Sequence, residues 1–116
     1  DVTCSAVIHD NQAHIYRLSG DYNPLHIDPE AARFGGFDEP ILHGLCTFGH
    51  CAQLLLAALC DNDAKRFKKI RVRFSSPVFL NDKLDIKAWN DGPGRVLFEA
   101  AVGEKTVVSH AYFEYV

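Results

Sequence analysis

The segment 44–60, GLCTFGHCAQLLLAALC, constrains the fold more than any other part of this chain. Its only polar breaks are Thr47, His50 and Gln53, so a helix here is apolar on nearly every face. A helix of that kind has to be covered on every side. At about 1.5 Å per residue it spans roughly 25 Å. The chain therefore needs an architecture that encloses one long helix.

The rest of the chain has the pattern of β-strands. Apolar and polar residues alternate with a period of two, which is typical of half-buried strands. A weaker first strand is predicted over residues 2–8. Asp91–Gly94 and 103–105 have the composition of hairpin connections. The four alternating segments are 69–75, 84–89, 95–102 and 106–115.

One helix and several antiparallel strands favour an α+β class of fold. A curved sheet that wraps around the helix gives it cover, which is the layout of a hotdog fold. The 116 residues fit a single domain, residues 1–116. Such a sheet leaves two open edges, so we expect a homodimer or pairing with a second hotdog half.

Two short helices are predicted before the long one. Residues 12–18 form the first, which Ser19 and Gly20 end. Asp28, Pro29 and Glu30 begin the second, with Asp at the cap and Pro at the first position. Gly35 and Gly36 end it after at most two turns.

Composition excludes several classes of protein. A net charge of -3 argues against a nucleic-acid-binding protein, which needs a basic surface. No apolar run approaches the 18 or more residues of a membrane-spanning helix. No secretory leader is visible, and the start at Asp1 without Met suggests a piece of a longer product. The four cysteines show no C-x-x-C spacing and are expected to be buried, reduced thiols of an intracellular protein.

Asp21 and His26 are the first candidate catalytic residues. Pro24 lies between them and prevents a continuous helix, so the turn can bring both side chains to one side. A carboxylate and an imidazole that share one water can add that water to a carbon centre or remove it. The ordinary alternative is a turn Asp that caps backbone amides beside a surface His. Asn23 either bonds its own turn or orients the acid or the water with its side-chain amide.

Gly44 is the second kind of candidate, because it stands where the long helix begins. The first amides of a helix have no internal partner, and a Gly lets a ligand carbonyl approach them. Such amides can form an oxyanion hole. A plain helix-start Gly is the alternative. His43 is placed among the substrate-binding candidates, although a bond from its ring to a backbone carbonyl is its more ordinary role.

A metal site finds no support in the sequence. The six histidines contain no H-E-x-x-H or other helix-paired ligand spacing, so we expect no metal ion. G-x-S-x-G, P-loop and G-x-G-x-x-G motifs are also absent.

The stretch YRLSGDYNPLHIDPEAARFGGFDEPILHGLCTFG, residues 16–49, resembles the signature of the MaoC-like hydratases. These enzymes are also called hydratase 2 or (R)-specific enoyl-CoA hydratases. A weaker similarity continues through residues 61–79 and the closing strands, so it covers most of the chain. The similarity is strongest to the C-terminal, catalytic half of the hydratase region of peroxisomal multifunctional β-oxidation enzymes, which are double hotdogs. Bacterial relatives are single hotdogs that dimerise.

The resemblance implies a lyase that reversibly adds water to trans-2-enoyl-CoA and yields (3R)-3-hydroxyacyl-CoA. It identifies Asp21 and His26 as the catalytic pair, Asn23 as their support and the Gly44 amide as the oxyanion donor. No separate cofactor is implied, since CoA is part of the substrate. The implied location is the peroxisome in a eukaryote and the cytoplasm in a bacterium.

Three other functions remain open from the sequence. The first is a dehydratase that acts on 3-hydroxyacyl-carrier protein, and the second is a hotdog thioesterase. The third is a non-catalytic acyl-binding half, against which the presence of both Asp21 and His26 argues. Arg71 and Arg73, which follow Lys68 and Lys69, are candidate contacts for the CoA phosphates; a solvated strand face is the alternative.

Overall fold

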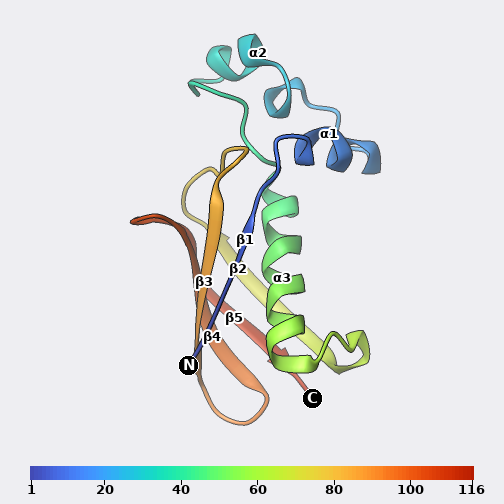
Figure 1. Ribbon diagram of the computed structural model, residues 1–116, viewed down its shortest axis with the longest axis vertical. Coiled ribbons are helices and arrows are strands. Elements are labelled where there is room, and N and C mark those ends of the chain that lie inside the picture. The colour runs from blue at the N-terminus through green and yellow to red at the C-terminus, as the bar shows by residue number, and fades with distance from the viewer.

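The computed structural model describes residues 1–116 as a five-stranded antiparallel sheet with one long helix against it (Figure 1). The strand order is β1-β3-β4-β5-β2, so β1 and β2 form the two edges. The helix α3 lies along one face of the sheet, and the short helices α1 and α2 gather beyond its N-terminal end (Figure 1). The strands are β1 Val2–Val7, β2 Phe67–Phe74, β3 Lys83–Asn90, β4 Arg95–Val102 and β5 Lys105–Tyr115.

The local signals for the helices are confirmed with small shifts. α3 spans Gly44–Cys60, the predicted range, and α2 spans Pro29–Phe34 with the Asp28 carboxylate accepting a hydrogen bond from the Glu30 amide at 3.0 Å. The predicted helix 12–18 is instead α1, Gln12–Tyr16, followed by a 3-10 turn over Arg17–Ser19. Two more 3-10 turns cover Pro24–His26 and Ala64–Arg66. No helix is both long and apolar enough to cross a membrane.

The prediction that α3 is buried on every side was wrong for this chain. The sheet covers only one side of the helix, where Cys51 and Leu55 are fully buried. Leu45 is 66 % exposed, and Gln53 and Ala57 are also exposed. A second hotdog that covers this side stays a prediction, which light scattering of the purified chain can test.

The alternation predicted for residues 106–115 fails in the middle of β5. Val107 and Val108 are both buried, although neighbours on a regular strand face opposite ways. The register against β4 shifts there, and His110 takes a φ of 49°. Such a bulge turns the chain locally, so both valines join the core around Phe113.

The cysteines are all free thiols, as predicted. Cys46, Cys51 and Cys60 are buried and Cys4 is half-buried. Desolvation raises the pKa of the Cys46 thiol to about 11 and that of Cys51 to about 12. Both therefore remain protonated at neutral pH and behave as small apolar groups.

Candidate active site

Asp21 and His26 meet at the N-terminal end of α3, where a turn brings them together. Gly20, with a φ of 124°, ends the 3-10 turn after α1, and Asp21 follows at once. Asn23 then caps the turn Pro24–His26: its side-chain oxygen accepts a hydrogen bond from the Leu25 amide at 3.0 Å. Asn23 thus bonds its own turn. Its predicted role in orienting the acid or the water stays a prediction.

The His26 ring is held by a backbone carbonyl from a distant segment. His26 is 8 % exposed, and its Nδ1 lies 2.7 Å from the carbonyl oxygen of Ile41. A carbonyl can only accept a hydrogen bond, so Nδ1 carries the hydrogen. The other ring nitrogen, Nε2, is then free to accept or return a proton.

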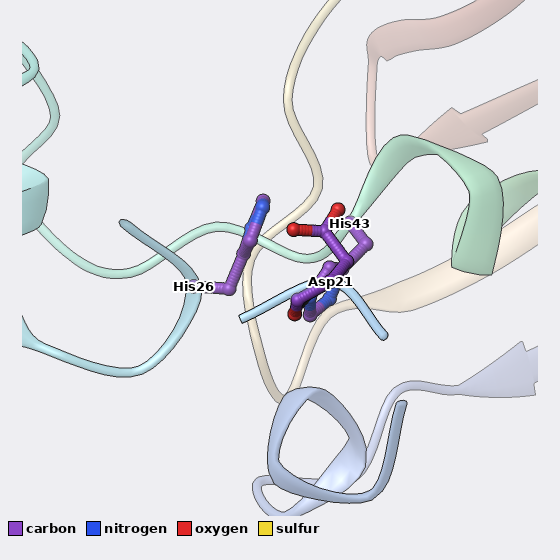
Figure 2. Close-up of side chains that lie close together, drawn as sticks. All are labelled: Asp21, His26 and His43. Carbon is purple, nitrogen blue, oxygen red and sulfur yellow. Dashed lines mark hydrogen bonds between the residues drawn. The ribbon is translucent and has the colours of Figure 1, made fainter. Parts of the chain in front are cut away.

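Asp21 has an exposed side chain, and its backbone carbonyl is hydrogen-bonded. Its Oδ1 accepts a long hydrogen bond of 3.4 Å from the Asn23 amide. Its carbonyl oxygen lies 3.2 Å from Nε2 of His43. Figure 2 shows the Asp21 carboxylate beside the His26 ring, with His43 close to both.

The side-chain donor atoms of Asp21, His26 and His43 lie within 4.8 Å of one another. Asp21 and His26 form no direct hydrogen bond, and one water can bridge a gap of that size. These three residues are also the only compact group of metal-ligating side chains. However, the His26 and His43 rings stack with an interplanar angle of 24°. Their lone pairs lie in nearly parallel planes and do not converge on one ion, unlike the ligands of a tetrahedral site.

His43 is the N-cap residue of α3 and is 1 % exposed. The bond to Asp21 is the kind of contact with a backbone carbonyl that we expected of it, while substrate contact stays a prediction. Desolvation lowers the pKa of His43, and the charges of His26 and Arg17 act in the same direction. The hydrogen bond to the Asp21 carbonyl and the charge of Asp21 oppose them. The balance keeps this ring neutral at physiological pH.

Gly44 is the first residue of α3 and borders a cavity of about 370 Å³. The Phe74 ring faces it: a Cβ at Gly44 would lie 3.5 Å from that ring, an ordinary contact. Ile41 also lines the cavity, and its carbonyl bonds His26, so it connects the cavity wall to the Asp21–His26 pair. The other lining residues are Phe37, Leu42, Thr47, Ser75, Ser76, Pro77 and Val78.

Arg71 and Arg73 lie on the edge strand β2 and are both exposed. They alternate with Ile70 and Val72, which are half-buried and pack against the core. The two arginines therefore project from the sheet face opposite to α3. The structure does not bring them to the cavity.

Two contacts of the site were missed by sequence reasoning. The Ile41 carbonyl has no sequence signal, because every residue carries one. Tyr16, the last residue of α1, packs against His43 with the two ring centroids 4.7 Å apart. The only available hint was that Tyr16 is the first residue of the stretch 16–49 that resembles the MaoC-like hydratases.

The comparisons with known proteins agree with this architecture. The model of the MaoC like domain matches residues 2–112. Peroxisomal multifunctional enzyme type 2 from Mus musculus is 51 % identical over 108 residues, which cover 91 % of this chain and 15 % of that protein. The peroxisomal enoyl-CoA hydratase 2 of Arabidopsis thaliana is 44 % identical over 108 residues, covering 91 % of this chain and 35 % of the relative.

Among solved structures, a MaoC-like dehydratase from Phytophthora capsici superimposes with a TM-score of 0.95 at 47 % identity. The match covers all of this chain and 42 % of that one. The chain thus spans less than half the length of each of these proteins. Because the family model covers nearly all of its residues, the chain belongs to the MaoC-like domain family.

Proposed function

We propose that the protein is an (R)-specific enoyl-CoA hydratase, which reversibly adds water to trans-2-enoyl-CoA. One observation carries the proposal: the Asp21 carboxylate and the His26 imidazole lie within a water's reach of each other. They do so at the start of α3, beside a cavity that Gly44 borders. The names of the mouse and Arabidopsis relatives, a multifunctional peroxisomal enzyme and an enoyl-CoA hydratase 2, support the same reaction.

The proposed chemistry assigns each group one task. The Gly44 amide donates to the thioester carbonyl and stabilises negative charge that develops on its oxygen. Asp21 and His26 hold one water over C3 of the enoyl group. The water oxygen bonds to C3, one proton of that water passes to the pair, and a proton from the pair is delivered to C2 on the same face. His26 acts through Nε2, since the Ile41 carbonyl occupies Nδ1.

The experiment that tests the proposal is hydration of crotonyl-CoA by the purified protein, with the loss of enoyl-thioester absorbance as the measure of hydration. The product is then offered to an (S)-specific 3-hydroxyacyl-CoA dehydrogenase with NAD. The fixed water and the fixed carbonyl expose only one face of C3, so a single enantiomer should form. The resemblance to the (R)-specific hydratases implies the (3R) alcohol, so we expect hydration without NADH formation. Substantial NADH formation would show that the stereochemical assignment is wrong.

The same preparation separates the alternatives. Faster turnover of crotonyl-carrier protein than of crotonyl-CoA would favour the dehydratase function. Release of free CoA thiol without hydration would favour a thioesterase. Binding of acyl-CoA with no turnover of any substrate would favour a non-catalytic half.

We also propose that Arg71 and Arg73 contact the CoA phosphates, although their sheet face requires the CoA to pass over the β2 edge. Arg71→Ala should then raise KM for crotonyl-CoA and leave KM for crotonyl-pantetheine unchanged, since only CoA carries the phosphates. Lys87→Ala, on the exposed side of β3, is the matched control. Equal effects of Arg71→Ala on the two KM values would reject the contact with the CoA phosphates.

The peroxisomal names of the relatives suggest a peroxisomal location for this protein as well. Imaging of the full-length protein fused to a fluorescent tag can test it.

A further inference from the structure

The His43 ring is buried directly beside the proposed catalytic pair. It is 1 % exposed, and its Nε2 lies 3.2 Å from the carbonyl oxygen of Asp21. That carbonyl can only accept, so Nε2 carries the hydrogen. Nδ1 is buried and has no hydrogen-bond partner. His43 therefore contacts the pair through one donor and through the face of its ring.

The ring face packs directly on His26. The two ring centroids are 3.7 Å apart with an interplanar angle of 24°, while Tyr16 packs on His43 at 4.7 Å and 47°. His26 has only one side-chain hydrogen bond, to the Ile41 carbonyl. One bond leaves the ring free to rock about that contact, and the stack restrains this motion. Thus His43 restrains His26 by its face and Asp21 by its edge.

We propose that His43 is a positioning residue that sets the spacing between the Asp21 carboxylate and Nε2 of His26. This inference rests on the proposed hydratase function and deepens it. Neither partner can shift without disturbing a contact to the same buried ring. This role does not require His43 to contact substrate, because its Nε2 already donates a hydrogen bond to the Asp21 carbonyl.

The charges around His43 suit this role. The titratable groups that face it are Asp21 and Arg17, together with His26 and Tyr16 on its ring faces. Burial is the main cause that holds the pKa of His43 below its ordinary value, and the electrostatic effects of His26 and Arg17 act in the same direction. A neutral ring can stack on His26 whether or not His26 carries the proton of the reaction. A second cation at 3.7 Å would repel the first.

The test uses two variants that each keep half of the His43 ring's contacts. His43→Gln retains an N–H that can reach the Asp21 carbonyl but lacks the ring face. His43→Phe retains the ring face but lacks the donor. We expect each to lower kcat by about 10²-fold with little change in KM, because a displacement of about 1 Å has that cost. His50→Gln is the matched control: His50 also bonds a carbonyl, that of Cys46 at 2.9 Å, but lies outside the site, so kcat should be unchanged.

A double-variant cycle distinguishes positioning from a merely structural role. In the Asp21→Asn background, His43→Gln should cause little further loss, since residues that act as a unit are not additive. Losses that multiply would overturn the proposal. So would a loss of kcat that matches the unfolded fraction measured by circular dichroism.

A readout that needs no activity keeps this inference separate from the hydratase function. In ¹⁵N-resolved NMR spectra, we expect the Nδ1–H signal of His26 to be broadened or lost in His43→Gln and kept in His50→Gln. An unchanged His26 signal in folded His43→Gln would overturn the positioning role. If the variants show the expected difference in the His26 signal but the wild-type protein hydrates no enoyl thioester, the proposed function fails. The restraint of His26 by His43 then still stands.

Discussion

Asp21→Asn and His26→Ala should each lower kcat for enoyl-CoA hydration by about 10⁴-fold or more. That loss is at or above the upper end of the 10²–10⁴-fold range that is typical of general acid–base groups. The reason is that one water needs both groups: one takes its proton and the other delivers a proton to carbon. Neither substitution removes core packing around Phe113, because both residues lie in the segment between α1 and α2 and outside the hydrophobic core cluster. The measurement is steady-state kinetics with crotonyl-CoA at saturation, on variants whose folding is checked by circular dichroism.

Matched controls exist within the same segment. Asp28→Asn changes another turn aspartate, whose side chain caps α2 and can still accept a bond as an amide. His14→Ala removes an exposed histidine of α1. Both should keep wild-type turnover. If Asp21→Asn or His26→Ala stays within about tenfold of wild type, the loss is too small for a shared-water pair and the assignment fails.

Much of the architecture follows from local sequence signals. The bounds of α3 follow from an apolar run that begins at Gly44 and ends at Asp61, a residue with a left-handed φ of 52°. The start of α2 follows from Asp28 and Pro29, because capping and the fixed φ of proline act within one turn. Strands β3 and β4 follow from alternation, which places Leu84 and Phe98 in the core.

The features that could not be predicted depend on partners distant in sequence. The double burial of Val107 and Val108 comes from a register shift against β4, which alternation within β5 does not encode. The exposure of one side of α3 depends on what covers it, and apolar composition alone cannot say whether the same chain provides the cover. Composition therefore indicates the need for burial but not its source.

The candidate site divides in the same way. Asp21, His26 and Gly44 can be recognised as candidates from their residue types and their positions in the sequence. The contacts that hold the first two cannot be recognised in this way. The His26 ring bonds the carbonyl of Ile41, 15 residues away, and the Asp21 carbonyl bonds His43, 22 residues away. Backbone carbonyls and stacked rings leave no motif, and only the fold brings them together.

The Gly44 amide can be removed without changing the helix that carries it. Gly44→Pro should lower kcat/KM for crotonyl-CoA by about 10²–10³-fold, the usual cost of losing one oxyanion-hole donor. Proline has no amide hydrogen, and its Cδ takes that hydrogen's place. The first position of a helix favours proline, since its amide has no intrahelical partner. His43, with φ of -57° and ψ of 134°, already has the extended conformation that a following proline requires.

Gly44→Ala is the control that separates the amide from added bulk. It keeps the N–H and adds only a Cβ, 3.5 Å from the Phe74 ring, so most of the activity should remain. The two variants should unfold at similar temperatures, because neither breaks a hydrogen bond within α3. Kinetics with crotonyl-CoA and thermal unfolding of both variants measure the difference. If Gly44→Pro is as active as Gly44→Ala, the thioester carbonyl does not bind the Gly44 amide and the oxyanion is held elsewhere; a large gap at equal stability assigns the stabilisation to that one N–H.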